Sequence, residues 1–387
     1  MPPEFDASRR KFMGTAGILG MSAVVGGVRA ADVVPLEPPD RQPANLKLPK
    51  PPGKTVGWAI VGLGKLALEE VMPAFDMCRL SRPVALVSGH REKAEQVAKV
   101  YGVKADNIYN YENYDELKNN KDVDVIYIIL PNSMHAEYTI RGVKARKHVL
   151  CEKPMAANVE ECEKMIAAAQ EAKRKLMIAY RLRYEPFNKK AIELCRSKEF
   201  GEIQSISASN GQVVQAPNIR LSKELAGGPL GDVGVYCLNA CRYLTGEEPV
   251  EVTAMKHQPK DDPRFREVPA SLAWTMRFPS GVIANCDCSF NSAETRRFRV
   301  HGTKGYVQLD PAFSYEGLEL RTRKQAQESL VHLTPVNHFA AEMEDFSDCV
   351  LKDRDTLTPG EEGLADMRVI AAINEAVETG RVVKVRS

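Results

Sequence analysis

Residues 55–67 read Thr55-Val56-Gly57-Trp58-Ala59-Ile60-Val61-Gly62-Leu63-Gly64-Lys65-Leu66-Ala67, an apolar run that passes directly into a glycine-rich turn. Residues 55–61 are rich in β-branched and other apolar side chains, which predicts a buried strand. The positions after the turn have helical spacing through Glu70, Met72 and Phe75. Strand, GxGxxA and helix in this order form the dinucleotide-binding fingerprint.

Each small residue of the fingerprint has a physical reason. Gly62 permits the tight turn, and Gly64 lets the backbone approach a pyrophosphate without a Cβ in the way. Ala67 allows the helix and the strand to pack closely, and the helix N-terminus then faces the anion. We therefore expect the turn residues to bind the cofactor: Gly62, Leu63, Gly64, Lys65 and Leu66.

The second strand, over residues 83–88, decides which dinucleotide fits. An NAD site normally carries Asp or Glu at the end of this strand, whereas here the chain reads Ser88-Gly89-His90-Arg91-Glu92-Lys93. Ser88 and Gly89 can approach a 2′-phosphate, which Arg91 and Lys93 can neutralise. The alternative is that both cations belong to the solvated first turn of a helix, although cations are mildly unfavourable there. The sequence favours NADP.

Three further strands are predicted in the first half, over residues 123–130, 148–151 and 176–180, with helical patterns between them. This alternation is typical of a doubly wound α/β fold, in which the carboxyl ends of the strands face the ligand. We therefore expect the residues at these strand ends to line the cofactor: Leu130, Asn132, His135, Glu152, Lys153 and Arg181. His135 has the alternative role of a buried structural residue.

The second half changes pattern. From Ile203 onward, residues 203–208, 273–278 and 297–301 alternate as half-buried strands of an antiparallel or mixed sheet do. Helical patterns over 339–351 and 360–380 close the chain. The length of 387 residues suits two domains. We place a Rossmann domain over 54–180 and an α+β domain, which binds the substrate and forms the oligomer, over 181–387. The final helices of the second domain could pack back on the Rossmann domain.

The N-terminus has the pattern of an export signal. Ser8-Arg9-Arg10-Lys11-Phe12-Met13 is a twin-arginine motif, an apolar stretch follows, and Val28-Arg29-Ala30 offers a cleavage site. The stretch is too short and too glycine-rich for a membrane anchor. We expect residues 1–30 to be a signal that directs the folded protein through the twin-arginine machinery to the periplasm. The proline-rich residues 31–53 are expected to be extended. They form either a flexible linker or an arm that lies along the protein or on a neighbouring subunit.

Composition excludes several classes of function. A formal net charge of +2 produces no large positive electrostatic field of the kind that attracts a nucleic acid. The nine cysteines are scattered, and neither a CxxC nor a His-rich spacing indicates a metal site. No later segment is apolar enough to cross a membrane.

The motifs together resemble the glucose–fructose oxidoreductase, inositol dehydrogenase and rhizopine catabolism family (Gfo/Idh/MocA). The resemblance rests on residues 62–67, on Glu152-Lys153-Pro154 and on Gly231-Asp232-Val233-Gly234-Val235-Tyr236. It runs over nearly the whole chain and is strongest with the periplasmic glucose–fructose and aldose–aldose oxidoreductase subgroup. It implies a C-terminal domain whose large, open, mostly antiparallel sheet builds a homo-oligomer.

The resemblance also implies roles for single residues. Lys153 lies near the nicotinamide and the substrate hydroxyl. Many members carry Asp-x-x-x-His where this chain has Asp232 and Tyr236, a departure typical of the glucose–fructose subgroup. Arg181 matches a cofactor-proximal arginine, and Arg220 and Tyr315 match positions near the cofactor or the sugar. Pro217-Asn218-Ile219 departs from the tryptophan-containing version of that loop.

These residues predict an acid–base mechanism. Oxidation of a sugar hydroxyl at C1 needs a base, and a free tyrosine with a pKa of about 10 is a poor one. The ammonium of Lys153 would lower that pKa, and Asp232, four residues before Tyr236, could face the same cleft and bind the sugar. The alternatives are a core tyrosine and a helix-capping aspartate.

Location and cofactor together suggest how the enzyme cycles. The periplasm holds essentially no free nicotinamide nucleotide, so a cofactor that never leaves must be reoxidised by a second sugar. We therefore expect ping-pong transfer with tightly bound NADP(H), in which one aldose becomes a lactone and another sugar carbonyl becomes an alditol. The alternatives are an ordinary NADP-dependent aldose dehydrogenase with exchangeable cofactor, and a non-catalytic sugar- or redox-binding protein on the same scaffold.

Overall fold

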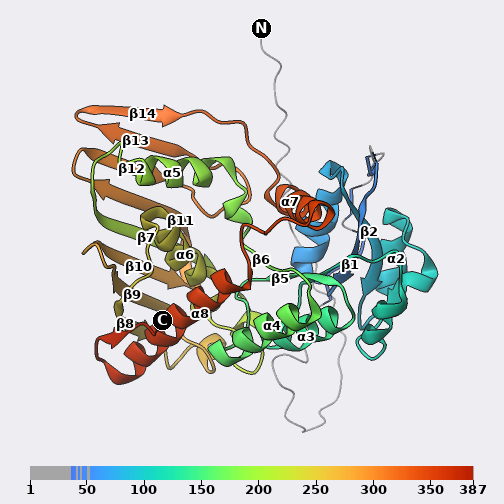
Figure 1. Cartoon of the computed structure of the whole chain (residues 1–387). Coiled ribbons are helices and arrows are strands. Elements are labelled where there is room, and N and C mark those ends of the chain that lie inside the picture. Colours follow the sequence, from blue (N-terminus) through green and yellow to red (C-terminus); the bar gives the residue numbers. More distant parts are fainter. Residues whose placement is uncertain (1–35, 41, 44–45, 50–52, 387) are drawn as a thin grey trace, which may run out of the picture.

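The computed structural model describes residues 36–40, 42–43, 46–49 and 53–386. The predicted export signal over residues 1–30 lies outside these ranges, as do parts of the proline-rich arm. Figure 1 shows two lobes, each built on one sheet, with helix α8 (Gly360–Thr379) running along both. Within the described ranges, no helix combines the length and the hydropathy needed to span a bilayer.

The first lobe is a six-stranded parallel sheet in the order β3-β2-β1-β4-β5-β6. This is the doubly wound order expected from the alternating sequence pattern. The strands are β1 (Val56–Val61), β2 (Ser81–Val87), β3 (Ile108–Tyr109), β4 (Val125–Ile128), β5 (His148–Glu152) and β6 (Leu176–Ala179). The helices among them are α1 (Met72–Ala74), α2 (Arg91–Tyr101), α3 (His135–Lys144) and α4 (Val159–Ala172).

Strand β1 is buried on both faces. Ala59 and Val61 belong to one hydrophobic core, whereas Trp58 and Ile60 belong to the other. A parallel sheet needs such cover on both sides, and this explains why β1 has a continuous apolar run instead of an alternating one. Part of the cover comes from far along the chain, because α7 (His338–Lys352) packs its apolar face on the core that contains Trp58.

The helix after the glycine turn begins with the α-helical residues Lys65 and Leu66 and then widens. Residues Ala67–Val71 form a π-type turn, in which the N–H of Met72 donates to the carbonyl of Ala67. Pro73 follows, and because proline has no N–H it cannot donate to the carbonyl of Leu68, its π-type partner. The Gln42 side chain supplies the missing donor at 2.8 Å. The described part of the arm thus lies against its own Rossmann domain, with Leu46 and Leu48 on the core.

The second lobe is a nine-stranded sheet in the order β14-β13-β12-β11-β7-β10-β9-β8-β15. Its neighbours are antiparallel except for β7 and β10, which run parallel. The strands are β7 (Ile203–Val213), β8 (Glu251–His257), β9 (Ser271–Arg277), β10 (Ile283–Ser289), β11 (Asn291–Gly302), β12 (Gly305–Leu309), β13 (Leu320–Lys324), β14 (Gln327–Val331) and β15 (Val383–Lys384). The expected α/β class, with a Rossmann domain followed by an open, mostly antiparallel sheet, is confirmed.

Helices cover one face of this second sheet. In Figure 1, α5 (Pro186–Arg196), α6 (Val235–Thr245) and α8 lie on the same side of it. A buried row of cross-strand partners runs beneath them, through Trp274, Cys286, Ala208 and Phe298. The opposite face carries no helix in the described ranges, and its residues alternate with the buried row as exposed side chains.

The two lobes share one core, which extends from Ala59 in β1 to Trp274 in β9. A buried ion pair joins α6 to α8, because Arg242, whose side chain is 3% exposed, binds Asp366 at 2.6 Å. Arg242 also binds the exposed Glu248 at 2.6 Å. All nine cysteines fall in the described ranges, where each is buried with a free thiol.

Candidate active site

The glycine turn fits a dinucleotide. Gly62 has a φ of +91°, and a Cβ there would lie 2.3 Å from the carbonyl oxygen of Ile129, so the strand-to-helix turn requires glycine. A Cβ on Gly64 would meet no atom within 4 Å, which leaves open space beside the backbone for a ligand. Leu63 is buried, Leu66 is half-buried, and the exposed Lys65 pairs with Glu69 at 3.7 Å.

The end of β2 brings Ser88 and Gly89 beside this turn, because the N–H of Gly62 donates to the Val87 carbonyl. The Ser88 hydroxyl already accepts the N–H of His90 at 3.1 Å. The Arg91 guanidinium donates to Glu95 at 2.9 Å and to the Ile108 carbonyl at 3.3 Å. Lys93 is 8% exposed, and its burial lowers the pKa of its amine. Recognition of a 2′-phosphate by these four residues stays a prediction.

His135 has a structural role that the cofactor prediction did not include. It is 1% exposed, and its two ring nitrogens lie 2.8 Å from the Pro154 carbonyl and 2.9 Å from the Leu130 carbonyl. Each ring nitrogen therefore lies within hydrogen-bond distance of a backbone carbonyl, and the residue connects the Lys153-Pro154 turn to the end of β4. Contact of His135 with the cofactor stays a prediction. Asn132, nearby, donates to the carbonyl of Ala226 at 2.9 Å.

Lys153, which follows β5, forms a half-buried ionic cluster with Asp232 and Arg220. Nζ of Lys153 donates to the Asp232 carbonyl at 2.7 Å and lies 3.4 Å from its Oδ1. Nε of Arg220 donates to Oδ2 of the same carboxylate at 2.6 Å. Asp232 therefore ties together the two domains. It makes no side-chain cap, which excludes the helix-capping alternative for this residue.

Charge keeps the cluster ionised. Burial by itself would raise the pKa of Asp232, but Arg220 and Lys153 outweigh burial and hold that pKa below its ordinary value. Burial would likewise lower the pKa of Lys153, yet Tyr236, Asp232 and Glu152 raise it above its ordinary value. The site therefore holds an ammonium and a carboxylate side by side near neutral pH.

Tyr236 stands next to this cluster at the start of α6. Nζ of Lys153 lies 4.8 Å from the centroid of its ring, and the Arg181 guanidinium carbon lies 5.2 Å from it. The ring also packs on Phe313 at 5.8 Å between centroids. Asp232 and Tyr236 thus share one cleft. They do so through a π-type turn over Leu230–Gly234 followed by α6, not through a single regular helix.

Arg181 is held firmly under Tyr236. Its guanidinium donates to the Phe313 carbonyl at 2.6 Å and to the Ser314 carbonyl at 3.3 Å, and it lies 2.9 Å from Nδ1 of His338. Tyr315 stacks over it at 4.5 Å. His338 belongs to α7, and sequence reasoning did not single it out. In the sequence, His338 stands beside a late helical pattern. That pattern does not show that the helix packs on the first sheet.

Two buried carboxyl groups lie behind the cluster. Glu152 accepts the Tyr127 hydroxyl at 2.8 Å, and burial raises the pKa of Glu152. Glu342, one turn after His338 on α7, is fully buried and neither of its oxygens has a hydrogen-bond partner within the described residues. Burial, and then Glu152, raise the pKa of Glu342 well above its ordinary value. Glu342 was also missed by sequence reasoning.

Family models match both domains of the chain. The model of the oxidoreductase family with an NAD-binding Rossmann fold (GFO/IDH/MocA) matches residues 56–180. The model of the GFO/IDH/MocA C-terminal domain matches residues 188–308. A D-xylose 1-dehydrogenase [NADP(+)] from Haloarcula marismortui is 32% identical over 337 residues, which cover 85% of this chain and 93% of that protein.

Solved structures add to the comparison. An aldose–aldose oxidoreductase from Caulobacter crescentus, complexed with glycerol, has a TM-score of 0.83 and 43% identity, covering 86% of this chain and 100% of that chain. A 3-ketoreductase from Actinomadura kijaniata in complex with NADP and TDP-benzene has a TM-score of 0.76 at 23% identity, covering 84% of this chain and 98% of that chain, which supports the fold alone. The chain therefore belongs to the GFO/IDH/MocA oxidoreductase family.

Proposed function

We propose that this protein is a sugar oxidoreductase with tightly bound NADP(H), which oxidises an aldose to its lactone and reduces a second sugar carbonyl to an alditol by ping-pong hydride transfer. The observation that carries the proposal is the grouping of Lys153, Asp232 and Tyr236 where β5 ends. The names of the xylose dehydrogenase and the aldose–aldose oxidoreductase support an aldose as the substrate.

Tyr236 is the proposed acid–base residue. Two cations face its ring, so negative charge that develops on the reacting atoms beside it would be stabilised. Tyr236 would take the proton of the C1 hydroxyl in one direction and return it to a carbonyl oxygen in the other. Lys153 would hold the reacting oxygen with its ammonium, and the Asp232 carboxylate would accept a hydrogen bond from a neighbouring sugar hydroxyl.

The proposed cofactor residues fall into three sets, one for each part of NADP. The turn of Gly62, Leu63, Gly64, Lys65 and Leu66 would hold the pyrophosphate, because its backbone leaves space for an anion at a helix N-terminus. Ser88, Gly89, Arg91 and Lys93 would hold the 2′-phosphate of NADP, and Leu130, Asn132, Glu152, Arg181, Arg220 and Tyr315 would line the nicotinamide end. NADP, when bound, supplies the acceptor and then the donor of hydride.

The setting of the enzyme is part of the proposal. The twin-arginine motif at Arg9 and Arg10 supports export of the folded protein to the periplasm, with cleavage near Ala30. A resident cofactor would let the enzyme cycle there without free nucleotide. The helix-free face of the nine-stranded sheet is the proposed contact between the subunits of a homo-oligomer.

Purification without added nucleotide tests the recycling model. We expect protein that carries about one equivalent of NADP(H), seen by its absorbance, and that converts a pair of sugars into lactone and alditol with no nucleotide supplied. Protein that arrives free of cofactor and turns over only with excess NADP+ would be an ordinary aldose dehydrogenase, the second candidate function.

Replacement of Tyr236 by Phe tests the catalytic assignment. Loss of acid–base catalysis is worth roughly 10²–10⁴ in rate, so kcat for sugar oxidation should fall by that range while bound NADP(H) is retained. Tyr306→Phe is the matched control, because that hydroxyl contacts Glu328 at 2.7 Å on the surface of the second lobe. Unchanged turnover in Tyr236→Phe would refute the assignment, and no turnover by the unaltered protein would favour a non-catalytic binding protein.

A further inference from the structure

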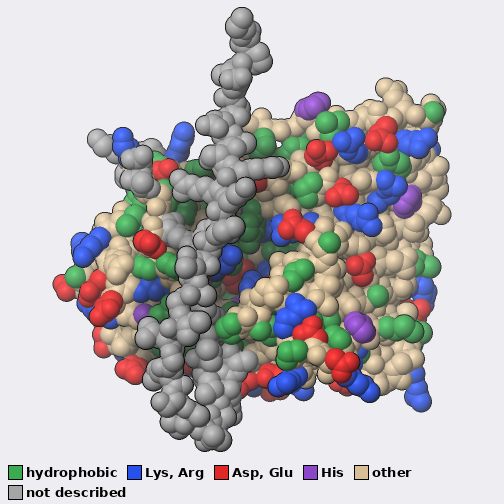
Figure 2. All heavy atoms as spheres, turned by 180° about the vertical axis from the view of Figure 1, so that it is seen from behind, with side chains coloured by type: hydrophobic (Ala, Val, Ile, Leu, Met, Phe, Trp, Pro, Cys, Tyr) green, Lys and Arg blue, Asp and Glu red, His purple; other side chains and the backbone are tan. Residues whose placement is uncertain are grey.

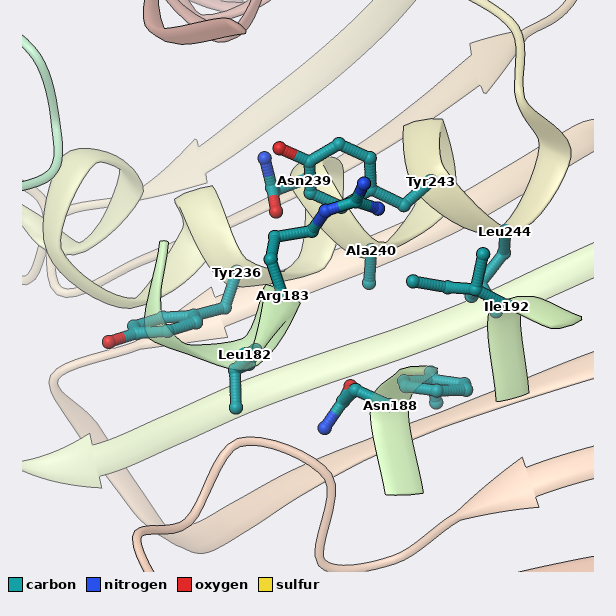
Figure 3. A pocket seen from close by; sticks show the side chains of 10 residues that line it. Leu182, Arg183, Asn188, Ile192, Tyr236, Asn239, Ala240, Tyr243 and Leu244 are labelled. Carbon is teal, nitrogen blue, oxygen red and sulfur yellow. The ribbon is translucent and has the colours of Figure 1, made fainter. Parts of the chain in front are cut away.

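The ring of Tyr236 is not packed tightly on every side. A cavity of about 20 Å³, which has room for about one water molecule, lies beside it and is lined in part by Leu182, Asn239 and Ala240. In Figure 3 the Tyr236 hydroxyl is directed away from these residues, so the cavity borders the ring and not the reactive oxygen. A void removes packing contacts from one side of a group. The position of the ring therefore depends more on the groups that face it elsewhere.

Arg181, which follows β6, is one of the groups that face this ring. Its guanidinium carbon lies 5.2 Å from the centroid of the Tyr236 ring and 4.5 Å from that of the Tyr315 ring. The side chain is buried, and burial by itself would lower the pKa of Arg181, but Tyr236 and Tyr315 raise it above its ordinary value. A buried guanidinium that keeps its charge needs hydrogen-bond acceptors to hold it in place.

The acceptors around Arg181 are unequal. Nη2 donates to the Phe313 carbonyl at 2.6 Å, whereas Nε is buried with no hydrogen-bond partner within the described ranges. Nη1 donates to the Ser314 carbonyl at 3.3 Å, which is long for a hydrogen bond, and lies 2.9 Å from Nδ1 of His338. His338 is therefore the closer acceptor of Nη1. Without it, in the part of the chain that the structure describes, Nη1 would keep only the long bond.

The chemistry of His338 suits an acceptor. Burial, and then the Arg181 guanidinium, lower the pKa of His338 to about 3, so the ring is neutral near neutral pH. A guanidinium has no lone pair to offer, so Nδ1 must accept the N–H of Nη1. The ring also stands on a well-fixed element. It begins α7, whose first turn is capped by the Asn337 side chain, which accepts the N–H of Ala340 at 2.9 Å.

We infer that His338 is a positioning residue, which holds the Arg181 guanidinium against the ring of Tyr236 through the hydrogen bond at Nδ1. Its effect on catalysis rests on the proposed function, because it acts through the proposed acid–base residue. The contact itself rests only on the geometry around Arg181. A displacement of about 1 Å in an active site can cost about a hundredfold in rate, so loss of this acceptor should slow the reaction.

A kinetic cycle between His338 and Arg181 tests the effect on the reaction. His338→Leu removes the acceptor, whereas His338→Asn can place its amide oxygen where Nδ1 lies. With the cofactor saturating, His338→Leu should lower kcat/KM for an aldose such as D-xylose by about tenfold to a hundredfold, and His338→Asn should recover most of that loss. In an Arg181→Met background, His338→Leu should change kcat/KM by less than about twofold, because the residue that it positions is absent.

Urea unfolding of the same variants tests the contact without turnover. His338→Leu should lower the folded-to-unfolded ratio by about tenfold or more in the parent and far less in the Arg181→Met background. His148→Leu is the matched control. Nδ1 of His148, at the start of β5, accepts the N–H of Lys175 at 3.0 Å, so this variant also loses a histidine acceptor but should keep its kcat/KM.

Several results would overturn the inference. His338→Leu could keep the parental kcat/KM, His338→Asn could be as slow as His338→Leu, the loss could be equally large in the Arg181→Met background, or His148→Leu could be equally slow. Additive effects of His338→Leu and Arg181→Met on unfolding would likewise show that the two side chains do not act together. A parent that turns over no sugar would refute the proposed function instead, and the unfolding cycle would then decide whether His338 holds Arg181.

Discussion

Glu342 has an unusual environment for an acidic side chain. It is fully buried on α7. After burial, Glu152 and Asp345 raise its pKa, whereas Arg181 lowers it. Arg181 already binds the Phe313 and Ser314 carbonyls and His338. A carboxylate in such a place is unfavourable, so folding favours the protonated form of Glu342 and raises its pKa.

Glu342→Gln should therefore stabilise the protein, and increasingly so as the pH rises. The unfolded side chain loses its proton above about pH 4.3, whereas the folded one keeps it. The stability that the protonated carboxyl gives is complete below that pH and is lost as the pH rises toward the raised folded-state pKa. The advantage of Gln should grow by about 1.4 kcal/mol per pH unit in this window. Urea unfolding of both proteins from pH 5 to 8 measures it.

The exposed Glu378→Gln on α8 is the control, for which the difference from wild type should stay near zero at every pH. A gap between Glu342→Gln and wild type that does not change with pH would mean that Glu342 is ionised in the folded protein. Retained sugar turnover in Glu342→Gln is also expected, because a neutral side chain of the same shape preserves the setting of Arg181 and Tyr236.

The proposed catalytic residues near the sequence motifs could be named without the structure. Lys153 follows a predicted strand end, and Tyr236 stands four residues after Asp232, so pattern and resemblance were enough. Glu342 and His338 were not identified, because the sequence of a helix does not show whether a single acid or histidine in it is buried or exposed. His135 was assigned to the cofactor because it follows a strand end, but packing turned its ring to backbone carbonyls.

At the level of elements, the arm and the first helix depend on each other. The Gln42 amide donates to the Leu68 carbonyl at 2.8 Å, and the Gln42 side-chain oxygen accepts the Tyr101 hydroxyl at 2.5 Å. Pro73 is the reason that Leu68 needs this donor. The glycine turn begins at Gly62, five residues before Ala67, so the arm stabilises the element on which the proposed cofactor rests.

Gln42→Ala should lower the free energy of unfolding by about 1–3 kcal/mol, because it leaves the buried Leu68 carbonyl without a donor. The arm should also be cut faster by protease, and bound NADP(H) should be lost sooner on dialysis. Asp40→Ala is the control, since that exposed side chain lies on the same arm. Equal stability and equal proteolysis of the two variants would show that the arm is held by other contacts.

At the level of the whole molecule, the helix-free face of the nine-stranded sheet is the largest surface without a covering layer. Its side chains include Ala273, Asp287, Ser209 and Arg297, which are cross-strand neighbours. In Figure 2 the right half of the molecule shows charged side chains of both signs scattered among neutral ones, with no large apolar patch. Because the face carries charges of both signs, two copies of it could pair opposite charges across a symmetric contact.

Ala273→Arg tests the proposed homo-oligomer. The substitution adds a long cation at the centre of the exposed face, where a second copy would meet it with the same cation. Light scattering after size exclusion should show a smaller species than the unaltered protein forms. Ala371→Arg, on the exposed side of α8, should leave the mass unchanged. If both variants keep the parent mass, the subunits meet elsewhere or not at all.

The sequence by itself determined the local features of this protein. The glycine turn, the strand-helix alternation of the first half and the alternating strands of the second are written in neighbouring residues, because backbone freedom and burial period act over a few positions. The family and the fold class followed from them. Boundaries shifted by a few residues, as for β4, where the expected run of 123–130 forms a strand only over Val125–Ile128.

Only the tertiary structure decided which distant residues meet. It brought α7 from the end of the chain onto the first sheet and placed Arg220 against Asp232. It also buried the Glu342 carboxyl without a hydrogen-bond partner among the residues that the structure describes. These outcomes depend on long-range packing and on the desolvation of charge, which no local pattern of apolar and polar residues records.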